Sequence, residues 1–242
     1  MVTTKLDLSD GNPSNRFFDE PMPFRPAVRG AELRAAARRR LAGACDVREL
    51  RPEDLRALYD AYDILAFEGH LTWGVTHRRF EVCFEFGATV EDGVAGLGAC
   101  RVFVLPQELP VDEFGFPYRW LEIRIDRDLL QSAFAQNVEP VVIDGVRCDD
   151  PLDAVLVVLE HELLHLYEGL RYGVQSHGAM FKHLGSELFG HVLNDDHIKL
   201  PVTGCAVGVS LPKDHSSTEL STPVPSPSEA PADAATGSGG AA

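Results

Sequence analysis

The residues best suited to chemistry in this chain are two histidines and a glutamate in the run His161-Glu162-Leu163-Leu164-His165. In a helix, histidines at i and i+4 share one face, so both imidazoles reach a single metal ion. Glu162 lies about 100° further around the axis, where its carboxylate can approach a water in an open metal position. In zinc hydrolases the metal acidifies that water and the glutamate removes and returns its proton. Chance predicts only roughly 0.02 such runs in a chain of this composition.

A catalytic zinc site needs a third protein ligand and an open fourth position. The metzincin pattern fails, because it requires glycine and histidine where this chain has Glu168 and Arg171. Two candidates remain downstream, Glu187 and His177. Histidine and carboxylate ligands favour zinc, with manganese and iron as alternatives at a similar site.

The element that must position these side chains is a long helix. Pro151 is typical of a first helical position, Asp150 is a suitable N-cap and Gly173 a suitable end. Apolar residues lie nearly all round this stretch, which indicates a buried helix. A last helix is expected to begin near Ser176 and to run towards Gly190.

The preceding chain reads as helices followed by strands. An Arg-rich helix is expected at Ala31–Leu41 and a second helix from Pro52. Alternating or continuous apolar runs then predict strands, and Asp144-Gly145 predicts a hairpin turn; these segments are 80–86, 102–105, 121–125 and 139–147. The expected fold class is therefore α+β, with helices packed on a small, mostly antiparallel sheet.

The motif His161-Glu162-Leu163-Leu164-His165, about a dozen connecting residues and then His177-Gly178-Ala179-Met180-Phe181 resembles the SprT-like zinc metalloprotease family. The resemblance covers about residues 46–192. It implies a zincin-like domain with His161, His165 and His177 as zinc ligands and Glu162 as general base and acid. The chain departs from several family members because Cys205 alone cannot build a C-terminal zinc ribbon.

The resemblance also implies a substrate and a binding mode. The expected function is zinc-dependent hydrolysis of peptide bonds in a protein or peptide, with DNA-associated or crosslinked proteins as one substrate class. A substrate peptide would lie extended along an edge strand, for which we expect Leu121–Ile125. The alternatives are a non-proteolytic zinc-binding adaptor and a DNA-associated factor that works through its arginines.

Charge divides the chain into three parts. With 22 basic and 37 acidic residues, the 242-residue chain has a net charge of −15. Residues 1–45 carry +3, residues 46–212 carry −15 and residues 213–242 carry −3. We expect a flexible N-terminal segment, a metalloprotease domain and a disordered Ser/Pro/Ala/Gly-rich tail with these boundaries. An acidic domain repels phosphate, so the net charge does not support nucleic-acid binding.

One basic cluster interrupts this pattern, formed by Arg29, Arg34, Arg38, Arg39 and Arg40. We expect a solvated helix face, with nucleic-acid contact or docking on the acidic domain as alternatives. Five scattered cysteines and the lack of a signal-like or membrane-spanning apolar run predict a cytoplasmic protein without membrane contact. The oligomeric state is not predicted.

Overall fold

The structure of the chain is a computed structural model that describes residues 29–41, 46–91, 94–104, 119–136, 140–173 and 175–193. All of these lie in one compact unit, residues 1–203. Residues 42–45, on the N-terminal side of the predicted 45/46 boundary, fall outside the described residues, as do the predicted 212/213 boundary and the predicted disordered tail.

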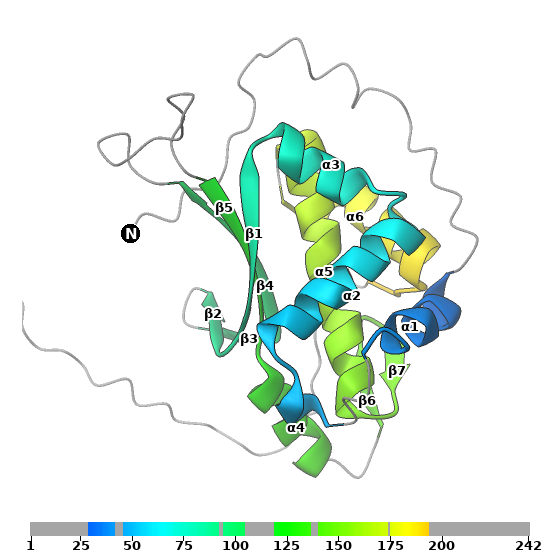
Figure 1. Cartoon of the computed structure of the whole chain (residues 1–242). Coiled ribbons are helices and arrows are strands. Elements are labelled where there is room, and N and C mark those ends of the chain that lie inside the picture. The colour runs from blue at the N-terminus through cyan, green and yellow to red at the C-terminus, as the bar shows by residue number, and fades with distance from the viewer. Residues whose placement is uncertain are drawn as a thin grey trace, which may run out of the picture. The chain divides into compact units, whose positions relative to one another are not determined.

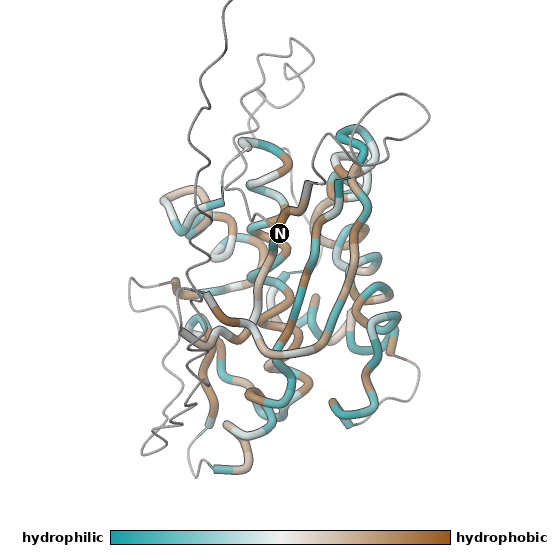
Figure 2. Tube along the Cα trace, turned by 90° about the vertical axis from the view of Figure 1, so that its left-hand side faces the viewer, coloured by the Kyte–Doolittle hydropathy of each residue, from teal (hydrophilic) through white to brown (hydrophobic). Residues whose placement is uncertain are grey.

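A three-stranded sheet forms one layer, with strand order β1 (Phe80–Phe86), β5 (Arg119–Ile125), β4 (Gly98–Val104). β1 runs parallel to β5, whereas β4 runs antiparallel to it. Two antiparallel pairs accompany it, β2 (Thr89–Glu91) with β3 (Val94–Gly96) and β6 (Val141–Ile143) with β7 (Val146–Cys148). Hydrophilic and hydrophobic residues alternate along β1 and β5 (Figure 2), as a sheet with one buried face requires.

The helices are α1 (Gly30–Arg38), α2 (Pro52–Ala66), α3 (His70–His77), α4 (Arg127–Gln136), α5 (Pro151–Tyr172) and α6 (Ala179–Leu184). A short 3-10 turn, η2 (Val47–Glu49), precedes α2, and a π-helical turn, η3 (Gly185–Phe189), follows α6. Helices α2, α3 and α5 lie on one face of the three-stranded sheet (Figure 1). Mixed helices and small sheets of this kind make the fold α+β.

The position of β5 corrects one expectation. β5 pairs on one side with β1 and on the other with β4, so it is the central strand and its backbone is already hydrogen-bonded on both sides. A peptide therefore cannot add to Leu121–Ile125. The strand that lies at the sheet edge beside α5 is β4.

Helix α5 forms as its sequence predicts. The side chain of Asp150 accepts a hydrogen bond from the backbone N–H of Asp153 at 2.9 Å, Pro151 occupies the first turn, and Gly173 ends the helix at φ 73°. Its central residues are almost all buried between the sheet and the other helices. The helix that carries the metal motif is thus the centre of the core.

Two helices, α3 and α4, were not predicted, and in both a buried aspartate accepts hydrogen bonds from backbone N–H groups of the first turn. Asp63 accepts hydrogen bonds from the backbone N–H groups of Leu71 and Thr72 at 2.8 and 3.0 Å. Asp126 accepts one from Leu129 at 2.9 Å. In the first case the capping residue lies on the preceding helix, so the capping depends on the tertiary structure and not on a local pattern.

The Arg-rich helix is part of the same core. Leu33 and Ala37 of α1 are fully buried. Arg34 binds Glu160 at 2.8 Å and Arg38 binds Asp153 at 2.6 Å, both on α5. The solvated-face expectation is therefore wrong for these two arginines, which dock the helix on the acidic domain.

Candidate metal centre

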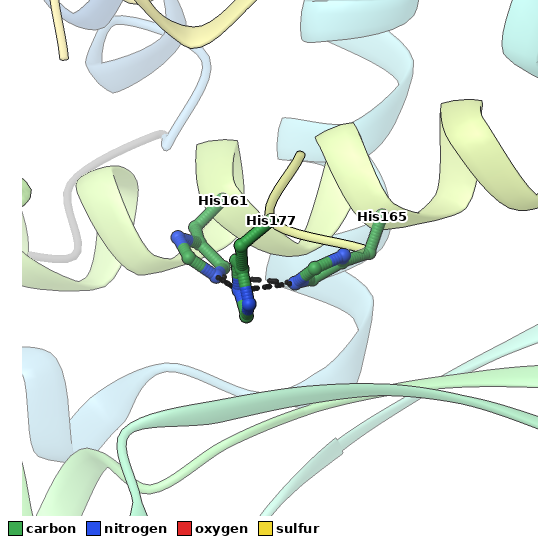
Figure 3. A group of neighbouring side chains, drawn as sticks. All are labelled: His161, His165 and His177. Carbon is green, nitrogen blue, oxygen red and sulfur yellow. Dashed lines mark hydrogen bonds between the residues drawn. The ribbon is translucent and has the colours of Figure 1, made fainter. Parts of the chain in front are cut away.

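The three predicted histidines meet beside α5. His161 and His165 extend from α5 one turn apart, and His177 comes from the segment before α6 (Figure 3). Their Nε2 atoms form a nearly equilateral triangle, with separations of 3.2 Å between His161 and His165, 3.2 Å between His161 and His177 and 3.1 Å between His165 and His177. Among the described residues, this is the cluster whose ligand atoms lie close enough to hold one metal ion.

The triangle fits a tetrahedral zinc. Zn–N bonds of about 2.0–2.1 Å at tetrahedral angles separate ligand nitrogens by about 3.3–3.4 Å. The observed 3.1–3.2 Å is close to this separation. Burial also changes across the cluster: His161 is buried, His165 half-buried and His177 exposed. The site therefore has an open side through which a water or substrate group can enter.

The tautomer of His161 follows from its second nitrogen. Nδ1 lies 2.8 Å from Oδ2 of Asp144, and a carboxylate only accepts, so Nδ1 carries the proton and Nε2 presents its lone pair to the triangle. Burial lowers the pKa of His161, but the hydrogen bond to Asp144 and the charge of Glu162 outweigh it and raise the pKa above its usual value. The proton that this pKa describes binds Nε2, so a metal ion would compete with it for that atom.

The segment that carries His177 is held by α5. The backbone N–H of Ser176 donates to Oε2 of Glu168 at 3.1 Å, and the N–H of Gly178 donates to Oγ of Ser176 at 3.2 Å. Burial raises the pKa of Glu168, although the hydrogen bonds from Ser176 oppose the shift. Glu168 thus stands at the sequence position where the metzincin motif has glycine. Here it holds the segment that carries His177.

The ring of Phe181 packs against all three histidines. Its centroid lies 4.9 Å from that of His161, 4.5 Å from His165 and 5.0 Å from His177. Phe181 itself is fully buried. An apolar ring in this place limits the rotation of the imidazoles and excludes water from one side of the cluster.

Glu162 lies on the side of α5 that faces β4. Its side chain is buried, and a β-carbon on Gly98 would overlap its Oε1 atom and would lie 2.6 Å from Cγ1 of Val158. Only a glycine at position 98 allows the edge strand to approach the carboxylate this closely. The thiol of Cys100, two residues further on β4, has its pKa raised by burial and by the charge of Glu162.

Replacing Gly98 with alanine therefore tests the position of Glu162. The added methyl group must displace the carboxylate and push β4 away from Val158, and a shift of about 1 Å costs about 100-fold in rate. We expect the peptide cleavage that the motifs predict to fall by about 10- to 100-fold, while the predicted zinc content stays at the level of the unmodified chain. Cleavage assays and metal analysis measure this, with Gly169→Ala as the control, because a β-carbon at Gly169 makes only ordinary contacts of 3.5 Å. Unchanged cleavage in Gly98→Ala would show that the close approach of β4 to Glu162 is not needed for activity.

Glu187, the other candidate for the third ligand, does not join the histidine cluster. Glu187 is half exposed and pairs with Arg29 at 3.2 Å, away from the histidine triangle. Tyr167 is buried and stacks on Phe67, with ring centroids 5.6 Å apart. His183 is exposed on α6. A further histidine, His197, and the pair Asp195-Asp196 lie outside the described residues.

Sequence reasoning missed several residues around the centre. Asp144, Glu160 and Glu168 are buried carboxylates that contact the site or its supports. Glu160 and Glu168 flank the motif on an otherwise apolar helix, and that was the available signal, because a buried carboxylate needs a partner. Asp144 gave no such signal, since an Asp-Gly pair in a hairpin turn is explained by the turn alone.

Comparison of the chain with protein-family models, with curated proteins and with solved structures finds no match. The likeness to SprT-like metalloproteases therefore rests on the motifs and stays a prediction. In the part of the chain that the structure describes, no helix is both long enough and apolar enough to span a membrane.

Proposed function

We propose that this chain is a zinc-dependent metallopeptidase of SprT-like type that hydrolyses peptide bonds. The observation that carries the proposal is the convergence of three imidazole Nε2 atoms at metal-ligand spacing, one of them in a carboxylate–histidine pair, beside the buried Glu162. A purely structural zinc site closes its fourth position with another protein ligand. Three histidines with an exposed side and an adjacent glutamate favour a catalytic site.

The chain's own residues would divide the work. His161, His165 and His177 would hold the zinc, which when bound supplies an acidified water and polarises the substrate carbonyl. Glu162 would accept the proton of that water and deliver it to the amine of the leaving peptide. Phe181 would keep the three imidazoles in place.

The substrate is expected to bind as an extended strand along β4. Gly98 places this strand directly against Glu162, and within the described ranges β4 pairs only with β5. A peptide added to the outer side of β4 would take its hydrogen bonds from the strand backbone. Its scissile bond would then lie between the strand and the α5 face that carries Glu162.

The arrangement offers less support for a nucleic-acid role. Of the basic cluster, Arg29, Arg34 and Arg38 form ion pairs with acidic side chains of the same chain. Arg39 and Arg40 remain exposed. Within this cluster only two exposed arginines thus lie outside the ion pairs just named, and on a chain of net charge −15 they make a small footprint for DNA.

Metal removal tests the proposal. The chain loaded with Zn²⁺ is expected to cleave unfolded casein or itself, a chelator is expected to reduce cleavage by more than about 100-fold, and added Zn²⁺ is expected to restore it, because the metal supplies the electrophile. Gel electrophoresis of the products and elemental analysis of the protein measure both quantities. A chain that binds one zinc tightly but cleaves neither substrate, with or without DNA, would instead indicate the zinc-binding adaptor.

A further inference from the structure

A buried polar chain connects the histidine triangle to the N-terminal helix. Nδ1 of His161 lies 2.8 Å from Asp144, within hydrogen-bond distance. Nε2 of His191 lies 2.9 Å from Glu160, also within that distance, whereas its Nδ1 faces Asp144 at 3.7 Å, which is too long for a hydrogen bond. Glu160 also contacts Arg34 of α1 at 2.8 Å. The side chains of Asp144, Glu160 and His191 are all at most 1% exposed.

We propose that Asp144 is the positioning residue of His161, and that Arg34, Glu160 and His191 hold it there, so that helix α1 is a structural part of the metal centre. This inference rests on the proposed function, because it takes the three histidines as metal ligands. It adds to the metal centre a supporting residue, Arg34, that lies more than a hundred residues before His161 in the sequence.

Asp144 reaches His161 from a tight turn. Asp144 and Gly145 both have positive φ, 49° and 75°, and join β6 to β7 as the two central residues of a hairpin turn. Its carbonyl accepts a hydrogen bond from the N–H of Val192 at 2.7 Å, and a β-carbon on Gly145 would lie 2.6 Å from Cβ of Val192. The turn thus contacts α5 through His161 and packs against the segment that follows η3 through Val192.

A carboxylate on the far nitrogen of a metal-binding histidine has a defined effect. It selects the tautomer whose other nitrogen has a free lone pair, it stops the ring from rotating and it makes the ligand more basic. Asp144 is placed to do all three for His161. The residue acts through His161 and is not expected to touch the substrate.

Glu160 connects helix α1 to His191 through one of its carboxylate oxygens, Oε2. Its Oε1 accepts from the hydroxyl of Tyr62 at 2.8 Å, and its Oε2 accepts from Arg34 at 2.8 Å. A fully buried carboxylate is stable only with such charged and hydrogen-bonding partners. The same oxygen lies within hydrogen-bond distance of Nε2 of His191, and the other ring nitrogen, Nδ1, faces Asp144. Arg34 therefore neutralises the carboxylate that orients His191, and the ring of His191 packs beside Asp144 in the turn.

The first test changes Asp144 without breaking its turn. Glycine and asparagine both tolerate a positive φ, so Asp144→Gly removes the carboxylate and Asp144→Asn replaces it with an amide that can still accept a hydrogen bond. We expect Zn²⁺ affinity, measured by competition with a chromophoric chelator, to fall by about 10- to 100-fold in Asp144→Gly and by less in Asp144→Asn. The visible absorption of bound Co²⁺ should change in Asp144→Gly, because the ligand geometry relaxes.

The control for this test is Asp149→Asn, in the same part of the chain, where the side chain is 75% exposed and pairs with Arg147. It should bind Zn²⁺ and Co²⁺ as the unmodified chain does. Zinc affinity within about twofold of the unmodified chain in Asp144→Gly would overturn the role of Asp144. An unmodified chain that binds neither metal would instead contradict the proposed function itself.

The second test addresses helix α1. In Arg34→Met we expect several-fold weaker Zn²⁺ binding and an altered Co²⁺ spectrum, whereas Arg39→Met, at an exposed position just after the same helix, should change neither. If circular dichroism shows that Arg34→Met does not fold, the double variant Arg34→Met/Glu160→Gln replaces it, since it leaves no unpaired buried charge. A folded variant of either kind that binds zinc like the unmodified chain would overturn the part of the inference that concerns α1.

Discussion

Replacing Glu162 with glutamine is expected to reduce peptide cleavage by about 10²- to 10⁴-fold, the usual contribution of a general acid–base residue. Glutamine has almost the same shape and fits the space against Gly98, but its amide cannot take up a proton at neutral pH. Zinc content should not change, because the metal would be held by the three histidines and not by Glu162. Initial rates of casein cleavage and elemental analysis on the same preparation measure the two effects.

The matched control for this substitution is Glu53→Gln, which makes the same chemical change at an exposed position in the first turn of α2. Its cleavage rate should equal that of the unmodified chain. Full cleavage by the Glu162→Gln variant would rule out the glutamate-assisted mechanism. Loss of zinc together with cleavage would show instead that Glu162 supports the metal site.

His177→Ala is expected to abolish both metal binding and cleavage. Removing a carboxylate that only orients a ligand already weakens metal binding by about 10- to 100-fold, so removing a ligand itself should cost more than about 100-fold. Two histidines one turn apart on α5 would remain, and they leave two positions of a tetrahedral metal without a protein ligand. Zinc affinity by competition and cleavage rate are the quantities to compare.

Two controls separate this effect from general damage to α6. His183→Ala removes an exposed histidine of the same helix and should bind zinc normally. Glu187→Ala removes the other candidate third ligand and should also bind zinc normally, because Glu187 pairs with Arg29 away from the triangle. Zinc retained in His177→Ala but lost in Glu187→Ala would exchange the two assignments.

The elements that the sequence predicts best are those whose signals are local. Asp150, Pro151 and Gly173 bound α5 as expected, and Asp144-Gly145 forms the expected hairpin turn. Each of these signals depends on backbone conformation and on hydrogen bonds within a few residues. The spacing of His161 and His165 is of the same kind, because helix geometry alone places them on one face.

The errors concern relations between distant segments. Leu121–Ile125 was correctly predicted as a strand, but its apolar pattern cannot say whether one or two neighbours pair with it. The arginines of α1 read as a solvated face because their partners on α5 lie more than a hundred residues away. In both cases the missing information was a pairing between segments and not a local preference.

The sequence by itself determined the chemistry that this chain can offer: a helix with two histidines and a glutamate at metal-site spacing, and two candidates for a third ligand. Only the tertiary structure decided that His177 completes the triangle, that Gly98 brings the edge strand to Glu162 and that Asp144 holds His161. The physical reason is that local backbone rules act over a few residues, whereas the geometry of the site depends on how buried side chains from separate segments satisfy one another's charges and hydrogen bonds.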